Sequence, residues 1–192
     1  AGRHQRIDAA RGSAAAHKVA DVEVAGFLSG GVDSAYLTAL ARPARTYTIS
    51  YAEPKYDESF PARALARSLG VRNRVRRISP GEFWDAVPAV QYHMDEPLAD
   101  AAAVALYFLN REAAKDVKVV LSGEGADELF GGYNIYRDPF TARWYDRLPP
   151  WLRAGLGAAA SLLPPARGVN FLVRRGMSLE ERYFGPTALF NE

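Results

Sequence analysis

The clearest indication of the fold is the segment Phe27-Leu28-Ser29-Gly30-Gly31-Val32-Asp33-Ser34. The run at 21–28 is apolar and β-prone and stops at Ser-Gly-Gly, which is typical of a buried strand that enters a tight turn. Residues 32–41 then carry apolar side chains at helical spacing, and Pro43 ends the helix. The stretch therefore predicts a strand, a short loop and a helix in succession.

The same alternation continues on both sides of this unit. Helices are predicted at 6–19, 58–69, 80–92 and 100–115, and further strands at 46–50, 71–78 and 117–121. Gly70 is a good helix end, whereas Pro88 should kink or break the helix that contains it. Strands that alternate with helices predict a parallel, doubly wound sheet of about four or five strands, so the fold class is α/β and Rossmann-like. The arginines of 71–78 suit an edge strand.

The character of the chain changes after about residue 138, where strand signals end. Pro149-Pro150 and Pro164-Pro165 separate short helical pieces that are rich in Trp, Arg and Leu. We therefore expect an α/β core at 1–138. Residues 139–192 should form a helical extension of the same domain, cut short by the end of the sequence.

Composition and charge exclude several classes of protein. The 192 residues allow one domain with a sizeable core. Lys and Arg number 24 against 22 Asp and Glu, and a formal charge of +2 gives no reason to expect nucleic acid or an acidic membrane as partner. The absence of cysteine excludes disulfides, thiolate zinc sites and a cysteine nucleophile within these residues. Neither a run of ~20 apolar residues nor a signal core is present, so we expect a cytoplasmic enzyme.

The loop at 29–34 is chemically suited to a polyphosphate. Helix N-termini present free backbone N–H groups and a positive dipole end, and glycines let a phosphate approach the backbone. Ser29 and Ser34 add hydroxyl donors, and Asp33 inside such a loop indicates a Mg²⁺ ion between carboxylate and phosphate. The loop is neither the P-loop nor the dinucleotide fingerprint. The alternative is a glycine-rich turn whose serines and aspartate only cap the next helix.

A second motif follows the strand at 117–121. It is Ser122-Gly123-Glu124-Gly125-Ala126-Asp127-Glu128-Leu129-Phe130-Gly131-Gly132-Tyr133. Its loop should lie at the same edge of the sheet as the first, and three carboxylates fall within five positions. Such crowding raises pKa values unless cations compensate, so a metal and a catalytic base would both explain it. The alternative, an acidic helix start, does not account for the four glycines.

These motifs resemble those of a known superfamily. Ser-Gly-Gly-x-Asp-Ser after a strand looks like the signature of the ATP-pyrophosphatase enzymes, which cleave ATP between its α- and β-phosphates. The motif at 122–133 closely resembles that of the asparagine synthetases of the glutamine-hydrolysing type, and Asp95-Glu96-Pro97 resembles a segment of the bacterial members. The resemblance covers residues 20–138.

The resemblance implies a set of site residues. The loop would hold the pyrophosphate part of ATP, and the adenosine part would contact four further positions. Together the implied ATP-binding residues are Leu28, Ser29, Gly30, Gly31, Val32, Asp33, Ser34, Ile49, Ser122 and Gly123. Asp33 and Asp127 match Mg²⁺ ligands, and Glu124 matches the acid–base residue of the amidation step. Since Leu28 and Ile49 end neighbouring predicted strands, an apolar adenine slot between them is physically sensible.

The implied reaction is formation of asparagine from aspartate, ammonia and ATP. The family's glutaminase domain, which carries a cysteine nucleophile, is expected upstream in the full-length protein, and a homodimer is possible. A lysine of the family lies further along than residue 192, so we expect these residues alone to bind ATP weakly and to have little activity.

Three alternatives stay open at this point. A β-lactam-synthetase-like enzyme would share the ATP site and differ in its acyl acceptor. A nucleotide-binding or assembly module would have no catalysis of its own. A tRNA-modifying member of the superfamily is disfavoured by the low net charge.

Overall fold

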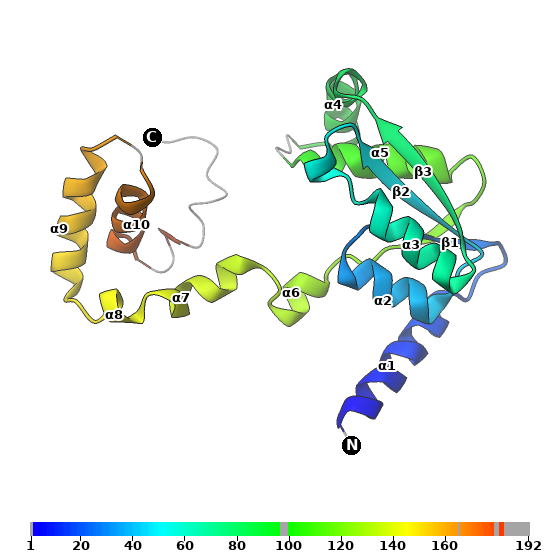
Figure 1. Cartoon of the computed structure of the whole chain (residues 1–192), viewed down its shortest axis with the longest axis horizontal. Coiled ribbons are helices and arrows are strands. Elements are labelled where there is room, and N and C mark those ends of the chain that lie inside the picture. The colour runs from blue at the N-terminus through cyan, green and yellow to red at the C-terminus, as the bar shows by residue number, and fades with distance from the viewer. Residues whose placement is uncertain (1, 97–99, 165, 179–180, 183–192) are drawn as a thin grey trace. The chain divides into compact units, whose positions relative to one another are not determined.

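The computed structural model describes residues 2–96, 100–164, 166–178 and 181–182 (Figure 1). The chain forms two compact units, Ala1–Gly125 and Ala126–Glu192. Three parts of the sequence predictions lie outside the described residues: Pro97 of the Asp-Glu-Pro segment, Pro165, and the end of the expected helical extension.

The first unit is built on a parallel sheet with the strand order β3-β2-β1-β4. Its strands are β1 Val24–Phe27, β2 Arg45–Tyr51, β3 Arg72–Ile78 and β4 Val119–Leu121. In the middle of the sheet, Gly26 of β1 is in register with Thr46 of β2 and with Leu121 of β4. The predicted parallel α/β sheet is confirmed, and the arginine-rich β3 is an edge strand, as expected.

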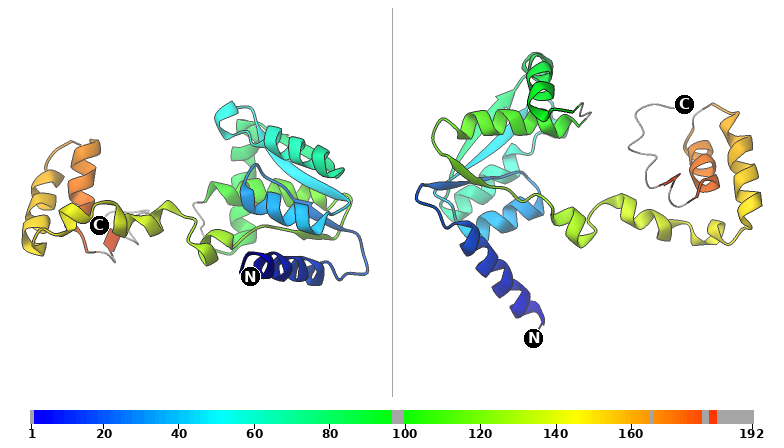
Figure 2. Two further views of the ribbon diagram at one scale, coloured as in Figure 1. Left: turned by 60° about the horizontal axis from the view of Figure 1, so that its bottom comes forward. Right: turned by 180° about the vertical axis from the view of Figure 1, so that it is seen from behind.

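Helices cover both faces of this sheet, as the front view of Figure 1 and the rear view of Figure 2 show. They are α2 Val32–Ala41, α3 Ser59–Leu69, α4 Pro80–Met94 and α5 Ala101–Ala113. The first helix, α1 Gly2–His17, packs against α2, and the 3-10 turn η1 Pro54–Tyr56 follows β2. Phe27 and Tyr47 pack with Ala113 at the end of α5, and Ile78 packs against α4 and α5. On the opposite face, Leu28 packs against α3. The unit is therefore doubly wound.

The face that carries α3 is lined by small polar residues of β2. The Thr48 hydroxyl donates to the Leu28 carbonyl over 2.6 Å, and the Asn73 amide donates to the hydroxyls of Thr46 and Thr48 over 3.0 and 2.9 Å. These bonds satisfy hydroxyls that are buried almost completely. The small side chains allow α3 to lie close to the sheet directly beside the end of β1.

Two helix-ending signals gave different outcomes. Gly70 ends α3 in the left-handed region with φ of 69°, as its position predicts. Of the kink or break expected at Pro88, the break is wrong, because α4 runs through that residue without interruption, and the kink stays a prediction. Pro88 is exposed, while Ala86 and Val90 are buried and Ser79 forms a capping box at the start of α4. Packing and capping therefore outweigh the one hydrogen bond that the proline removes.

The second unit contains only helical segments among its described residues. They are α6 Ala126–Phe130, η2 Asn134–Arg137, α7 Asp138–Thr141, α8 Arg143–Asp146, α9 Pro150–Ser161 and α10 Arg167–Gly176. α9 and α10 touch at Gly157 and Gly176, where a Cβ on either would lie within 3.0 Å of the Cα of the other. The domain boundary at 138 stays a prediction. No described helix combines the length and the apolar character that crossing a membrane requires.

Candidate active site

The first loop, residues 29–34, connects β1 to α2 and is held together by its two serines. The Ser29 and Ser34 hydroxyls lie 2.9 Å apart, and the Ser29 N–H donates to the Ser34 hydroxyl over 3.1 Å. The Gly31 N–H donates to the Ser29 hydroxyl over 3.0 Å, and no side chain caps α2 at Gly31. The serines therefore bond within the loop, and the Ser34 hydroxyl also donates to the Gly31 carbonyl over 3.2 Å. The alternative of a structural turn stays open beside the predicted phosphate site. The first turn of α2 keeps backbone donors for an anion.

Gly30 is required by the packing of the loop against α3. A Cβ at this position would lie 2.9 Å from Cγ of Pro61 and 3.1 Å from Cβ of Glu58. The Gly30 N–H also donates to Oε2 of Glu58 over 3.0 Å. The expectation that this glycine clears space for a phosphate stays a prediction, and the structure supplies a second reason for the glycine. No pattern in the sequence indicates this role of Glu58, which is 28 positions away along the chain.

The second loop, residues 122–125, meets the first loop through Gly123. A Cβ on Gly123 would lie 2.9 Å from the Ser34 nitrogen, 3.1 Å from its Cα and 3.2 Å from the carbonyl carbon of Asp33. Such close backbone contact follows from the strand order, because β1 and β4 are neighbours and their carboxyl ends lie together. The structure thus brings together two motifs that stand about 90 residues apart in the sequence.

Glu124 projects from the second loop as an exposed carboxylate. The Ser122 hydroxyl donates to its Oε1 over 3.3 Å, and both residues are exposed. Asp33, on the first turn of α2, is half-buried. The first unit therefore presents two acidic side chains on two loops that are in contact with each other.

Asp127 and Glu128 belong to the second unit and have different local surroundings. Asp127 is half-buried, and its carboxylate lies against Gly132, where a Cβ would overlap Oδ1. The Tyr133 hydroxyl donates to Oε1 of Glu128 over 2.7 Å and lowers the pKa of that carboxyl. The same hydrogen bond raises the pKa of Tyr133 to about 12. For Glu128, the rise in pKa expected from carboxylate crowding is therefore wrong.

A metal site made from protein ligands alone is not found. In the part of the chain that the structure describes, no three His, Cys, Asp or Glu side chains gather closely enough to hold a metal ion. The expected Mg²⁺ site stays a prediction.

Leu28 and Ile49 do not line a common slot. The parallel register pairs Phe27 with Tyr47, so Leu28 and Ile49 differ by one position and their side chains point to opposite faces of the sheet. Leu28 is buried among the alanines of α3, and Ile49 packs into the cluster formed by α4 and α5. The expected side-chain slot is therefore wrong. A ligand held at both positions would meet their backbones.

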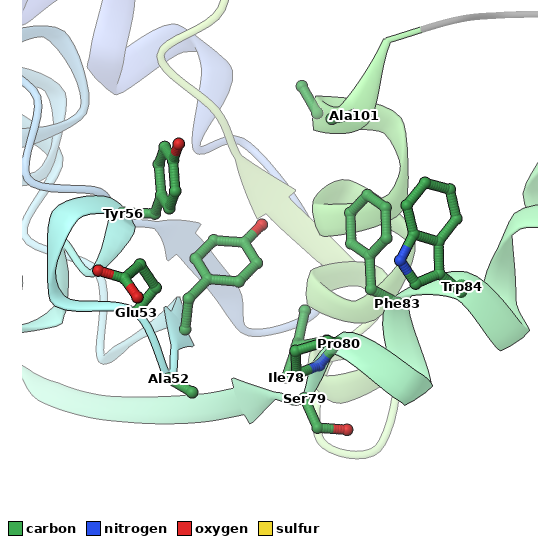
Figure 3. A pocket seen from close by; sticks show the side chains of 11 residues that line it. Ala52, Glu53, Tyr56, Ile78, Ser79, Pro80, Phe83, Trp84 and Ala101 are labelled. Carbon is green, nitrogen blue, oxygen red and sulfur yellow. The ribbon is translucent and has the colours of Figure 1, made fainter.

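An apolar pocket of about 410 Å³ lies beyond the carboxyl ends of β2 and β3. Tyr56 of η1 and Phe83 and Trp84 of α4 point into it in Figure 3. Tyr51, at the end of β2, also lines the pocket, and its pKa is raised by burial and by the nearby Glu58 charge. The pocket was not predicted from the sequence, where the adjacent aromatic residues at 83–84 are its signal.

Known proteins resemble this chain over most of its length. The family model described as asparagine synthase matches residues 8–185. Asparagine synthetase (glutamine-hydrolyzing) 1 of Bacillus subtilis is 40% identical over 96% of this chain and 30% of its own length. A putative asparagine synthetase (glutamine-hydrolyzing) of Mycobacterium tuberculosis is 46% identical over 93% of this chain and 28% of its own. Among solved structures, NMN synthetase from Francisella tularensis is 17% identical, with a TM-score of 0.46 over 69% of this chain and 58% of that one.

The chain thus spans less than a third of the length of these curated relatives. Within that span the family model includes both loops, the sheet that carries them and most of the second unit. The family model matches residues 8–185, whereas the resemblance seen from the motifs covered residues 20–138. The chain belongs to the asparagine synthase family.

Proposed function

We propose that the chain is the ATP-binding and amide-forming part of a ligase that makes asparagine. The enzyme would adenylate the side-chain carboxylate of aspartate, release pyrophosphate and transfer ammonia to the activated acyl group. The observation that carries the proposal is the backbone contact of Gly123 with Asp33 and Ser34, which brings the acidic second loop to the start of α2. The family membership supports the choice of reaction.

In this proposal the first loop binds the β- and γ-phosphates of ATP. The uncapped N-terminus of α2 supplies backbone donors and the favourable end of the helix dipole. Leu28, directly after β1, and Ile49, two residues before the end of β2, would contact the adenosine part through their backbones, together with Ser122 and Gly123. Binding at the carboxyl edge of the sheet is the usual arrangement in open α/β folds.

Asp33, at the start of α2, would be the Mg²⁺ ligand that the first unit supplies. The assignment of Asp127 as a second ligand rests on the resemblance of its motif alone, because Asp127 belongs to the second unit. Carboxylate oxygens are the hard ligands that this ion prefers, and they leave other positions for phosphate oxygens. When bound, the ion would offset the negative charge that develops on the leaving pyrophosphate.

The chemistry needs two steps because a carboxylate is a poor electrophile. In the first step, an aspartate side-chain oxygen bonds to the α-phosphorus, the α–β bridging bond breaks, and pyrophosphate leaves with that electron pair. In the second step, the ammonia nitrogen bonds to the acyl carbon and AMP leaves. Glu124 accepts the proton that the nitrogen loses. Its exposure on the second loop leaves the carboxylate accessible to ammonia.

The ammonia source is proposed from the relatives. Their names describe them as glutamine-hydrolyzing, and the chain spans about 30% of the length of the Bacillus subtilis protein. A glutaminase domain upstream in the full-length protein would supply ammonia. A cytoplasmic location and a homodimer remain predictions.

Replacing Glu124 by glutamine in the intact protein tests the proposal. The variant keeps the size of the side chain and loses the base, so asparagine formation should fall by about a hundredfold or more. ATP affinity should stay within about twofold, since the carboxylate acts after ATP is bound. Glu53→Gln, on the exposed loop after β2, is the matched control and should leave both quantities unchanged.

An isotope experiment separates the proposed reaction from other uses of ATP. Aspartate labelled with ¹⁸O in its side-chain carboxyl should transfer one ¹⁸O to AMP, detected by mass spectrometry. Formation of ADP instead of AMP would exclude adenylation, and full activity of Glu124→Gln would exclude the role given to that residue.

A further inference from the structure

Glu58 contacts the first loop directly, although neither sequence motif includes it. Its Oε2 accepts a hydrogen bond from the Gly30 N–H over 3.0 Å. Glu58 immediately precedes α3, and its side chain is exposed apart from this contact. The bond joins the loop after β1 to the start of α3, two elements that follow neighbouring strands.

Steric contact reinforces this hydrogen bond. Gly30 faces Cβ of Glu58 and Cγ of Pro61 so closely that an added methyl group would lie 3.1 and 2.9 Å from them. The opposite end of the same loop is in contact with Gly123 at Ser34. The first loop is therefore fixed at one end by α3 and at the other by the second loop.

Local bonds also hold Glu58 in place. The carboxylate of Asp57 accepts the Ser59 N–H over 3.0 Å, which fixes the chain at the first turn of α3. Ser59 is buried, so this turn is anchored to the body of the unit. Tyr51 lies near enough for the Glu58 charge to contribute to the raised pKa of its hydroxyl, after the larger effect of burial.

We propose that Glu58 is a positioning residue that sets the conformation of the first loop before ATP arrives. Its carboxylate holds the Gly30 N–H, and the α2 end of the loop is left to bind phosphate. Preorganisation of this kind raises affinity because the loop does not have to be ordered when the ligand binds. The inference rests on the proposed function, because it assumes that the loop binds the phosphates of ATP.

The proposal predicts opposite behaviour for two substitutions. Glu58→Ala removes the acceptor and should weaken ATP binding roughly fivefold, as expected for one lost hydrogen bond to a charged group in an exposed site. Glu58→Gln keeps an acceptor oxygen and removes a negative charge near the phosphates, so it should bind ATP as well as the wild type or better. Glu53→Ala removes the same charge from the same connection and contacts no part of the first loop in the described residues, so its affinity should not change.

The test combines calorimetry with NMR of the intact protein. ATP and Mg²⁺ are titrated into each variant, and KM for ATP and kcat are measured separately. An increase in the KM for ATP without a change in kcat in Glu58→Ala, with no such increase in Glu58→Gln, supports a positioning role for Glu58. The Gly30 amide proton in ligand-free protein provides a second readout, and it should shift upfield and exchange faster in Glu58→Ala alone.

Two results would overturn the inference. Unchanged affinity in Glu58→Ala, despite a shifted Gly30 amide, would mean that the bond does not serve ATP binding. Tighter binding in both Glu58 variants would mean that the carboxylate competes with phosphate for the loop. If wild-type protein binds no ATP, the proposed function itself fails and the positioning role with it. The Gly30 amide would still report whether Glu58 holds the loop.

Discussion

Replacing Gly123 by alanine tests the contact between the two loops, on which the candidate site depends. The added methyl group would lie 2.9 Å from the Ser34 nitrogen and 3.1 Å from its Cα. Both atoms are backbone atoms at the start of α2, so no side-chain rotation can relieve the overlap. Either the second loop or the first turn of α2 has to move.

The size of the effect follows from these distances. Ordinary contacts between carbon atoms begin at about 3.5 Å, so the two backbones must separate by roughly half an ångström. Overpacking of this kind typically costs about 1–3 kcal/mol, and Tm should fall by roughly 2–4 °C for each kcal/mol. Because a displacement of about 1 Å in a catalytic site can cost a hundredfold, we expect kcat/KM to fall about tenfold.

The assay compares two glycine-to-alanine variants of the intact protein. Thermal unfolding and ATP–pyrophosphate exchange are measured for Gly123→Ala and for Gly81→Ala, which lies on the first turn of α4. An added Cβ at Gly81 meets no atom within 4 Å, so this control should be neutral or slightly stabilising. If both variants unfold and react alike, the loops are not in the contact described, and the geometric basis of the proposed function is lost.

Two further predictions concern stability. Pro88→Ala should raise the free energy of unfolding by about 1–2 kcal/mol, because alanine restores a helical N–H donor at an exposed position. This gain is partly offset because the unfolded chain becomes more disordered without the proline. A lower urea midpoint for the variant would contradict the prediction. Hydrogen bonds from the Ser59 N–H and hydroxyl lower the pKa of Asp57 below its ordinary value of 3.8. The Asp57 carboxylate therefore stabilises the fold fully above pH 3.8, and this contribution is lost as the pH falls through the lower folded-state pKa. The destabilisation by Asp57→Ala should therefore shrink as pH falls below 3.8, and a penalty independent of pH in urea unfolding would refute the linkage.

Local patterns in the sequence predicted the elements well where a signal is complete within a few residues. The run that ends at Leu28, the glycines after it and the helical spacing from Val32 specify β1, the first loop and α2. Gly70 marked the end of α3 because only its lack of a side chain makes the left-handed cap inexpensive. Pro88 misled the same reasoning, since its effect on α4 depends on which face of the helix is exposed.

Contacts between segments that are distant in the sequence could not be predicted from local patterns. Nothing in the neighbourhood of Glu58 indicates that its carboxylate binds the Gly30 N–H, because that bond depends on how α3 packs beside the end of β1. Leu28 and Ile49 were expected to share a slot because both end strands, yet the register of β1 and β2 turns them to opposite faces. Register is a property of the pair of strands and not of either one.

Local patterns were enough to predict the kinds of element, the parallel class of the sheet and the two acidic, glycine-rich loops. The contact of Gly123 with the backbone of Asp33 and Ser34 follows from the packed fold alone. It exists because β4 lies beside β1 through packing of both sheet faces, a long-range effect that no local pattern encodes. Once that strand order is formed, the carboxyl ends of β1 and β4 are neighbours, and the two loops meet at one edge of the sheet.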